Sequence, residues 1–473
     1  MQHDRSDIRV TRLTPLSPEE LPESVRRYRA GRRLILCVDG GGIRGILTLQ
    51  ALKALEEHVG GRCIDIFDMF AGTSTGAIIA GGLAWGVSVD DLIELYRDEH
   101  RTIFARSKRW LVVAAAAAVL GALFGYAAGA VIGAVAGALL AGTGGGLIGR
   151  SQLVVPVYDH RPFRRILESL FGDDTLAHCH RDVLITGKDT VRAETTYFTA
   201  FHSSPMPRDE TAMESWLASV RGTYKNVMLR SAILASAGSV PIYFRPVGRF
   251  VDGGVGSFTN VSYAAPVEAL RFSAEPREVG RLNDDGKVDP GGRWPIYDYP
   301  AADQLYRPGE VGVVSFGTGK RITNMEVGEA KRISTALGWI GWIINEILND
   351  ADEHQSYVAL QELMREQQAI DFRRFQIHFT PQTMEVLRNL VPGLPDRVDG
   401  SKLTLDAVRQ FELLDAIGRG FGAWLRQSRS GDDRSRFDLR EHVALGHPVT
   451  WRPERYHIDE YSREVMEELA RRS

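Results

Sequence analysis

The chain has 473 residues and a formal net charge of -3 at pH 7, a length that suits one large domain or two to three ordinary ones. A charge so near zero lacks the positive excess of nucleic-acid-binding proteins, so we expect no nucleic-acid partner. The three cysteines, Cys37, Cys63 and Cys179, lie far apart without metal-ligand spacing. They indicate the reduced thiols of an intracellular protein, and we expect no metal site.

The first predicted strand follows a polar arm. Residues 1–32 are rich in proline and arginine and lack the apolar segment of a secretory signal. Residues 33–38 form an apolar run typical of a buried strand, and apolar residues recur at helical spacing over 46–59. Between these segments stands Asp39-Gly40-Gly41-Gly42-Ile43-Arg44-Gly45. The pattern therefore predicts a strand, a glycine loop and a helix.

The glycine loop allows two interpretations. Gly40 to Gly45 satisfies the dinucleotide-binding pattern G-x-G-x-x-G, and Asp65 stands near the distance of the ribose-binding acid. Asp65 precedes the next strand, however, whereas the ribose acid belongs at the end of a strand. The other interpretation needs no cofactor. In it, the N–H groups of Gly40, Gly41 and Gly42 form a nest that stabilises the oxyanion of an acyl-transfer reaction.

A second strand, turn and helix are predicted over residues 66–80. Gly72-Thr73-Ser74-Thr75-Gly76 fits the nucleophile elbow G-x-S-x-G, in which a tight turn presents a serine hydroxyl above a sheet edge. Strand and helix nearly touch in such a turn, so a Cβ at Gly72 or Gly76 would clash. The helix directs its positive end at Ser74, which favours an oxyanion there. We therefore expect Ser74 to be a nucleophile.

A third motif, Asp252-Gly253-Gly254, follows the strand pattern of residues 249–251. An isolated Asp-Gly pair is typical of an ordinary turn. At the end of a strand, however, the carboxylate of Asp252 emerges at the edge of the sheet, as the hydroxyl of Ser74 does. Because the two other motifs are also present, we interpret Asp252 as a catalytic group.

Together the three motifs resemble those of the patatin-like phospholipase family, and the resemblance covers about residues 33–110 and 150–320. It extends to the small-residue stretch 231–241 and to the apolar stretch 313–319. The resemblance implies an α/β fold, a three-layer α/β/α sandwich over residues 33–325. It also implies a lipid acyl hydrolase with a Ser–Asp dyad and no histidine, in which Ser74 attacks and Asp252 takes the proton.

Residues 110–149 are an unusual tract for that family. The tract contains no Asp, Glu, Lys, Arg or His, and Gly121, Gly125, Gly129, Gly133 and Gly137 recur at every fourth position. This spacing places the glycines on one helical face, as in small-residue packing between membrane helices. A single membrane crossing would separate Ser74 from Asp252. The tract is therefore interpreted as an apolar helical insertion that enters a membrane, forms an oligomer interface through residues 111–148, or is buried.

The region beyond residue 325 carries no catalytic motif. We predict that residues 326–473 form a mostly helical C-terminal extension that packs on the hydrolase domain or provides a lid or partner surface. An ordinary α/β-hydrolase would need a histidine from this region. The candidates are His354, His378, His442, His447 and His457, and none follows a recognisable strand.

The expected reaction is hydrolysis of fatty-acyl esters in membrane phospholipids. An isolated serine hydroxyl is a weak nucleophile, so Asp252 has to be partly desolvated to raise its pKa and act as a base. Arg44 either orients a phosphate head group or braces the glycine loop, and both alternatives stay open.

The expected partner is a phospholipid or a membrane surface, and the expected location is cytoplasmic, with membrane association and homo-oligomerisation as open alternatives. The competing hypothesis is an effector in which the apolar tract carries the function and the hydrolase fold is a scaffold. By analogy with bacterial relatives of the family, that effector could be a signal-activated antiviral defence protein.

Overall fold

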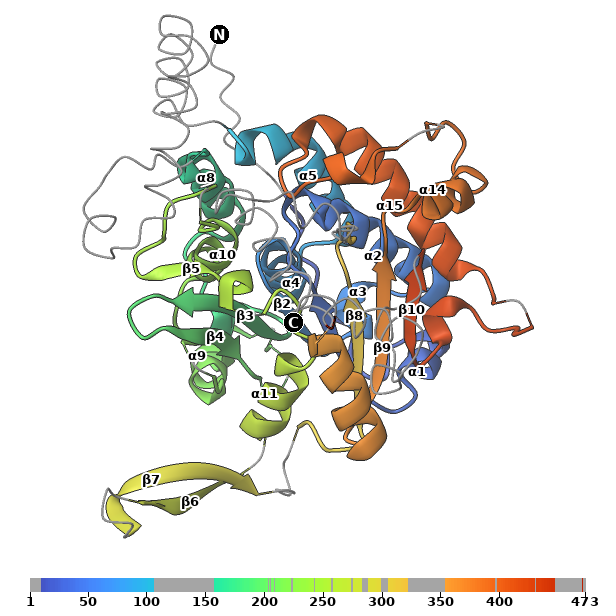
Figure 1. The fold of residues 1–473 in the computed structure, drawn as a ribbon. Helices are drawn as coiled ribbons and strands as arrows, with labels where there is room; N and C mark the ends of the chain where they lie inside the picture. Colours follow the sequence, from blue (N-terminus) through green and yellow to red (C-terminus); the bar gives the residue numbers. More distant parts are fainter. Residues whose placement is uncertain are drawn as a thin grey trace, which may run out of the picture.

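A computed structural model of the chain describes residues 10–105, 157–298, 305–321, 354–446 and 470, apart from 203, 205, 208, 223, 242, 257, 274, 283–287, 396–397 and 430. Its centre is an eight-stranded sheet in the order β10-β9-β8-β1-β2-β3-β4, with β5 paired to β3 (Figure 1). The strands are β1 (Arg33–Val38), β2 (Met69–Gly72), β3 (Asp182–Asp189), β4 (Glu194–Ala200), β5 (Phe250–Asp252), β8 (Val311–Phe316), β9 (Ile370–Ile377) and β10 (His442–Leu445).

The parallel part of the sheet sets up one functional edge. Strands β10, β9, β8, β1, β2 and β3 run parallel, while β4 and β5 are antiparallel to β3. Val38 at the end of β1 is level with Gly72 of β2 and Phe316 of β8. The loops that follow these three strands therefore leave the sheet side by side. Ligands bind at this carboxyl edge in open parallel sheets.

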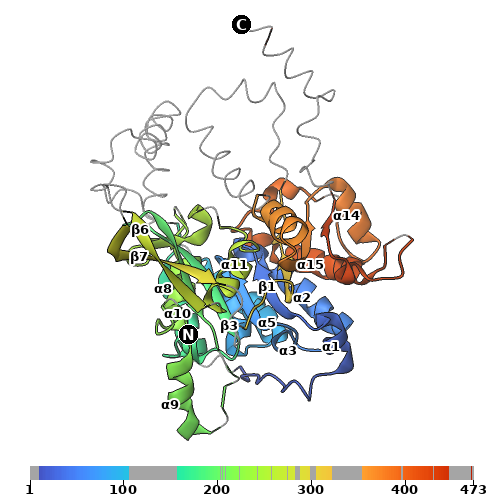
Figure 2. The same cartoon turned by 90° about the horizontal axis from the view of Figure 1, so that it is seen from below.

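Helices cover both faces of the sheet, as the expected three-layer α/β/α fold requires (Figures 1 and 2). Side chains alternate along β1: Leu34, Leu36 and Val38 pack on one face and Ile35 and Cys37 on the other. The first face is covered by α2 (Gly45–Val59), α4 (Thr75–Trp85), α5 (Val89–Ile103), α8 (His160–Phe171), α10 (Leu229–Ala237) and α15 (Phe411–Arg426). The second is covered by α11 (Ala264–Ser273) and the helix that ends at Glu366.

Four further helices and a second sheet are described. They are α1 (Glu23–Arg29), α3 (Cys63–Ile66), α9 (Glu210–Ser219), α14 (Pro381–Arg388) and a separate two-stranded sheet of β6 (Glu275–Leu282) and β7 (Val288–Asp298). The predicted strand from residue 66 begins later, at Met69, because Cys63–Ile66 form a helical turn before it.

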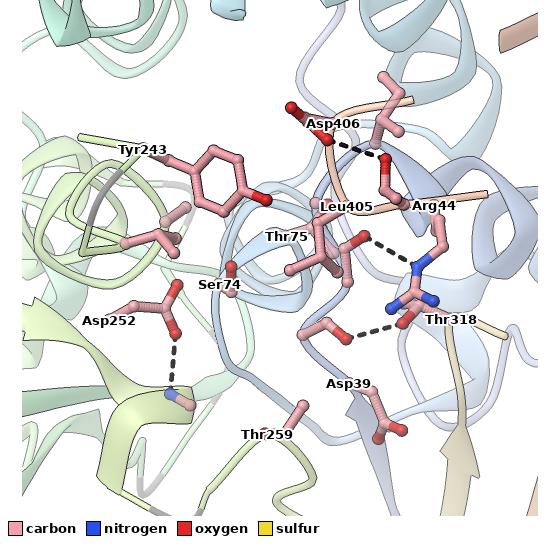
Figure 3. A pocket seen from close by; sticks show the side chains of 18 of the residues that line it. Asp39, Arg44, Ser74, Thr75, Tyr243, Asp252, Thr259, Thr318, Leu405 and Asp406 are labelled. Atoms are coloured by element: carbon pink, nitrogen blue, oxygen red, sulfur yellow. Dashed lines mark hydrogen bonds between the residues drawn. The ribbon is translucent and has the colours of Figure 1, made fainter. Parts of the chain in front are cut away.

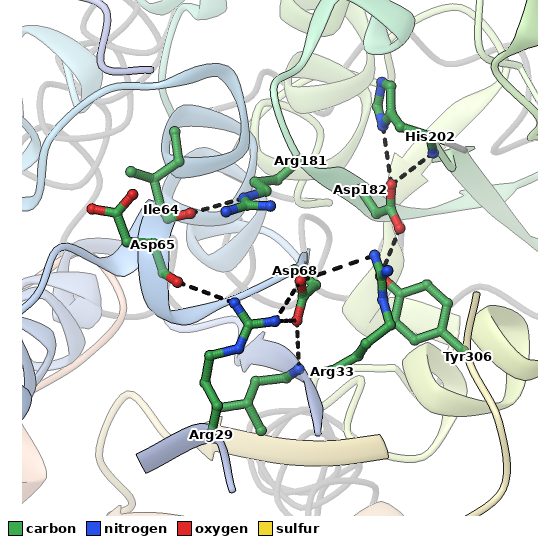
Figure 4. A network of polar contacts seen from close by, with 10 residues as sticks. Arg29, Arg33, Ile64, Asp65, Asp68, Arg181, Asp182, His202 and Tyr306 are labelled. Atoms are coloured by element: carbon green, nitrogen blue, oxygen red, sulfur yellow. Dashed lines mark hydrogen bonds and ion pairs between the residues drawn. The ribbon is translucent and has the colours of Figure 1, made fainter. Parts of the chain in front are cut away.

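A buried polar network holds the opposite, amino-terminal edge of the sheet (Figure 4). Asp68 accepts a hydrogen bond from the N–H of Leu34 at 2.9 Å and pairs with Arg29 at 2.6 Å. Asp182 accepts hydrogen bonds from Tyr306 at 2.6 Å and bonds the His202 ring at 3.0 Å. Together with the hydrogen bond from the N–H of Asp182 to the carbonyl of Asp68, these contacts join β1, β2 and β3 at the amino-terminal edge.

The apolar tract at residues 110–149 lies outside the described residues. The described chain stops at Ala105 and resumes at residue 157, and the carbonyl of Ala105 accepts a hydrogen bond from the N–H of Asp159 at 3.2 Å. The described segments that precede and follow the tract in the sequence are thus neighbours. Among the described helices, none combines the length and the apolar character that a membrane crossing requires.

The central sheet extends across the predicted division between residues 33–325 and 326–473. Strands β9 and β10 come from the C-terminal extension. β9 pairs with β8, which lies next to β1, and β10 pairs with β9 at the edge of the sheet. The division into an arm, a hydrolase domain and an extension stays a prediction about domain boundaries. The sheet includes two strands of the extension, so the extension contributes to the main core.

One ion pair joins the extension to the glycine loop. The guanidinium of Arg374 on β9 is fully buried and forms two hydrogen bonds with the carboxylate of Asp39, one of them 2.7 Å long. Arg374 also donates to the hydroxyl of Ser315 on β8 at 2.7 Å. Asp39 is the first residue of the loop after β1, so the cation from β9 fixes where the loop starts.

We predict that Arg374→Met destabilises the protein by about 3–5 kcal/mol, because it leaves the buried Asp39 carboxylate without its cation. Urea unfolding measures the effect. The matched control is Arg26→Met, which breaks the exposed pair with Glu23 and should cost less than about 1 kcal/mol. Equal losses for the two variants would contradict the structural role of the buried pair.

Candidate active site

Ser74 occupies a strained turn between β2 and α4. Its backbone has φ 55 and ψ -124, a conformation that residues with a Cβ rarely adopt. A Cβ on Gly72 would lie 2.1 Å from the carbonyl oxygen of Gly76, and one on Gly76 would lie 2.1 Å from that of Val38. The predicted clash at both glycines is confirmed, and it explains why the turn needs glycine on each side of the serine.

Two neighbours hold this turn in place. The N–H of Ser74 donates to the hydroxyl of Ser236 on α10 at 2.8 Å. The hydroxyl of Thr75, at the start of α4, is hydrogen-bonded to the phenol of Tyr96 on α5. The position of Ser236 in a small-residue stretch was visible in the sequence, whereas the contact with Tyr96 was not.

Asp252 reaches the same edge from β5. In the antiparallel pairing of β5 with β3, Asp252 lies opposite Gly187, and its Oδ1 accepts the N–H of Gly254 at 2.8 Å. A Cβ on Gly253 would lie 2.1 Å from the Thr186 hydroxyl oxygen, so this motif also packs at backbone distance. Asp252 and Ser74 line one cavity, as the sequence analysis required (Figure 3).

The carboxyl of Asp252 is almost completely buried. It is 4% exposed, and its Oδ2 has no hydrogen-bond partner of ordinary geometry within the described part of the chain. Burial raises the pKa of Asp252 to about 6, while the hydroxyl of Ser74 and the N–H of Gly254 pull the pKa down. The expected desolvation of this carboxyl is confirmed. A carboxyl with such a pKa accepts a proton more readily than an exposed one.

The cavity has a volume of about 550 Å³ and two kinds of wall. Its apolar wall comes from α4, α5, α8 and the chain after α10 and comprises Ile78, Ile103, Phe104, Phe163, Val240 and Phe244. Its cationic wall comprises Arg44, Lys320 and Arg321. Ser74 lines the same cavity as both sets of residues. An ester with an apolar chain on one side and an anionic group on the other would match this lining.

The glycine loop after β1 lies against Ser74. A Cβ on Gly40 would be 3.3 Å from the Cβ of Ser74. The N–H of Gly40 donates to the carbonyl of Thr259 at 2.8 Å. The prediction that Gly40 supplies an oxyanion donor is therefore corrected, because its N–H is already paired. Within the described residues, no hydrogen bond occupies the N–H groups of Gly41 and Gly42.

The other motif residues have structural contacts. Asp39 pairs with Arg374, as described above. A Cβ on Gly45 would lie 2.4 Å from the hydroxyl oxygen of Thr75, so the start of α2 packs directly on the elbow. Arg44 Nε donates to the carbonyl of Gly41 at 3.3 Å, and the Arg44 side chain also lines the cavity. Arg44 thus braces the glycine loop, and its position in the cavity is also compatible with binding a phosphate head group.

The cavity contains a histidine, but it is none of the five candidates from the C-terminal region. His100 on α5 lines the cavity. Its Nδ1 bonds the carbonyl of Arg97 at 2.8 Å, and its ring stacks on Phe411 at 4.3 Å. Of the five candidates, His354, His378 and His442 lie elsewhere, while His447 and His457 fall outside the described residues.

Comparison with known proteins indicates one family. A sequence model described as "Patatin-like phospholipase" matches residues 36–265. The chain is 35% identical over 96 residues to an intracellular phospholipase A2 of Caenorhabditis elegans, which covers 20% of this chain and 9% of that protein.

Two further relatives match over longer stretches. The chain is 24% identical over 292 residues to the 85/88 kDa calcium-independent phospholipase A2 of Mus musculus, which covers 60% of this chain and 30% of that protein. It is 26% identical over 268 residues to the cGAMP-activated phospholipase of Escherichia coli (strain TW11681), which covers 53% and 60%. The chain spans less than two thirds of the length of each of these relatives.

Proposed function

Residues 36–265 belong to the patatin-like phospholipase family, and from this premise we propose that the protein hydrolyses fatty-acyl esters of membrane phospholipids with Ser74 as nucleophile and Asp252 as base. The observation that carries the proposal is the pairing of a serine on a strained elbow with a desolvated carboxyl in one cavity. A buried carboxyl that has few hydrogen bonds is costly to maintain, which favours a role in catalysis.

In the first half of the reaction, Asp252 accepts the proton of the Ser74 hydroxyl as the serine oxygen attacks the ester carbonyl. The negative oxygen of the tetrahedral intermediate accepts hydrogen bonds from the N–H groups of Gly41 and Gly42. The N–H of Thr75, the residue after the nucleophile, is the further donor expected of such an elbow. Collapse of the intermediate releases the lysolipid alcohol, which takes the proton back from Asp252.

In the second half, water hydrolyses the acyl-enzyme. Asp252 accepts a proton from the water as it attacks the acyl carbonyl, and the same N–H groups stabilise the second oxyanion. Release of the fatty acid returns the proton to the Ser74 oxygen. A single carboxyl thus acts as base and then as acid in each half, so no histidine is needed.

The lining of the cavity supports a phospholipid as the substrate. The acyl chain would lie on the apolar wall formed by α4, α5 and α8, where burial of each methylene contributes roughly 0.8 kcal/mol. The phosphate would lie near Arg44, Lys320 and Arg321, since guanidinium and ammonium groups bind phosphate oxygens strongly. Arg44 would then both brace the glycine loop and bind the phosphate head group.

A second candidate function is a phospholipase that a nucleotide signal switches on, as in an antiviral defence effector. The relative from Escherichia coli, which is named as cGAMP-activated, supports this candidate. The match covers about half of this chain, and in this candidate binding of the nucleotide would be coupled to the hydrolase site.

Lipid mass spectrometry of phospholipid vesicles incubated with the protein tests the main proposal. We expect the wild type to release fatty acid and lysophospholipid, and Ser74→Ala and Asp252→Asn each to lower the rate by about 10³-fold or more. His100→Gln is the matched cavity control and should lower the rate less than about tenfold. Loss of activity in His100→Gln with Asp252→Asn still active would replace the dyad by a histidine mechanism. If the Ser74→Ala variant kept the full biological effect of the protein, the competing hypothesis would be favoured, in which the apolar tract carries the function and the hydrolase fold is a scaffold.

The pH dependence follows from the raised pKa of Asp252. The base has to be deprotonated, so kcat/KM should fall about tenfold per pH unit as the pH drops below about 6. Initial rates on a soluble ester between pH 4.5 and 8 give the profile. A midpoint that moves when His100 is replaced by Gln would assign the titration to the histidine instead.

The signal-activated candidate predicts a rate increase with cGAMP. We expect vesicle hydrolysis by the full chain to rise at least tenfold in its presence, and the increase to be absent in Ser74→Ala. AMP at the same concentration is the control. An unchanged rate with a panel of cyclic dinucleotides, while basal hydrolysis persists, would count against this candidate and leave the main proposal intact.

A further inference from the structure

A short loop from the C-terminal extension contacts the glycine loop directly. Residues 404–406, here called the strap, lie between two helical turns, Gly400–Lys402 and Val408–Gln410. Their flanks, Leu403 and Ala407, are buried, so both ends of the strap are anchored in the core. The strap lines the same cavity as Ser74 and lies well beyond the family match at residues 36–265.

The strap meets the glycine loop at backbone distance. The carbonyl of Leu405 accepts the N–H of Ile43 at 2.8 Å. A Cβ on Gly42, which has φ +59, would lie 2.1 Å from the same carbonyl oxygen. Only glycine allows this contact, and the strap therefore limits how the peptide groups of the loop can rotate.

The two proposed donors lie between two fixed peptide groups. On one side, the N–H of Gly40 is bonded to the carbonyl of Thr259, and on the other, the N–H of Ile43 is bonded to the carbonyl of Leu405. The N–H groups of Gly41 and Gly42 have no such bond among the described residues. Without the hydrogen bond to the carbonyl of Leu405, the glycine loop would be held at one end only.

The strap is itself held by the side chain of Asp406. Its Oδ2 accepts the phenol of Tyr158 at 2.8 Å, and its Oδ1 accepts the hydroxyl of Thr404 at 2.8 Å. Tyr158 is buried, stacks on Tyr243 at 6.0 Å, and donates its N–H to the Tyr243 carbonyl at 2.8 Å. Tyr158 thus connects the strap to the opposite wall of the cavity.

From these contacts we propose that Asp406 and Tyr158 are positioning residues for the oxyanion donors, and that the strap makes the C-terminal extension necessary for the chemical step. The inference rests on the proposed function, because it assigns the strap to the same oxyanion. Displacement of a catalytic group by about 1 Å can lower a rate about 100-fold. The strap prevents such displacement of Gly41 and Gly42.

Steady-state kinetics of the full chain on p-nitrophenyl butyrate test the proposal. This small ester has no phosphate, so its KM does not report on the cationic wall. We expect Asp406→Ala and Tyr158→Phe to lower kcat about 10- to 100-fold with KM changed less than about threefold. Asp406→Asn, which still accepts one hydrogen bond, should retain more activity than Asp406→Ala. The double variant Tyr158→Phe/Asp406→Ala should be no slower than Asp406→Ala, because both changes remove the same contact.

The control has to separate positioning from general destabilisation. Asp415→Ala is suited to this, since Asp415 is also buried in the extension and bonds Gln50 at 2.7 Å, between α15 and α2. It should lower the midpoint of urea unfolding without lowering kcat at 25 °C. The pH midpoint near 6 should be the same in wild type and Tyr158→Phe, because Asp252 keeps its environment.

Several outcomes would overturn the inference. They are an unchanged kcat in Asp406→Ala and Tyr158→Phe, an effect confined to KM, or an equal loss of kcat in Asp415→Ala. If Asp406→Ala does not fold, Tyr158→Phe and Asp406→Asn decide the matter. Failure of the proposed function has a different signature, since Ser74→Ala would then hydrolyse the ester at the wild-type rate.

Discussion

The site depends on a place where three backbone segments touch without room for a side chain. The carbonyl of Val38 at the end of β1 lies against the Cα of Gly76, and the carbonyl of Gly76 lies against the Cα of Gly72. This contact requires the positive φ of Ser74, because the chain has to reverse between two glycines that are four residues apart. The hydroxyl of Ser74 is consequently held at the edge of the sheet by close backbone packing.

Two buried carboxyl groups lie near this contact, and their surroundings differ. Asp39 is paired with a fully buried guanidinium, and this pair is part of the scaffold. Within the described part of the chain no cation is paired with Asp252, and its neighbours are the N–H of Gly254 and the hydroxyl of Ser74. Desolvation without a counter-charge raises the pKa of Asp252 to about 6. The difference between the two environments assigns one carboxyl to structure and suits the other to proton transfer.

The C-terminal extension contributes to the site in two ways. Through β9 it places the cation of Arg374 under the start of the glycine loop. Through residues 404–406 it places a carbonyl oxygen over the middle of the same loop. The loop is thus contacted from both sides by residues that follow it by more than 300 positions. Loss of the extension would remove both contacts and two strands of the sheet.

The local sequence pattern was sufficient to predict much of the fold and of the candidate site. A strand followed by glycines or by G-x-S-x-G has few stable conformations, so the elements around Ser74 and Asp252, their place at one sheet edge and the clash at Gly72 and Gly76 were predictable from residue order. The raised pKa of Asp252 followed from the need for a desolvated base. Each of these features depends on neighbours in sequence or on a rule that all parallel sheets obey.

Only the tertiary structure decided which distant groups meet. Several contacts join segments whose local sequences give no indication of each other. They are the pairing of Asp39 with Arg374, the bond between Gly40 and Thr259, the presence of His100 in the cavity and the contact of Leu405 with Ile43. Arg374 stands in a weakly alternating strand and Leu405 in a loop without a motif. Their roles arise from strand order and loop packing, which depend on the whole core and are not encoded in any short stretch of the chain.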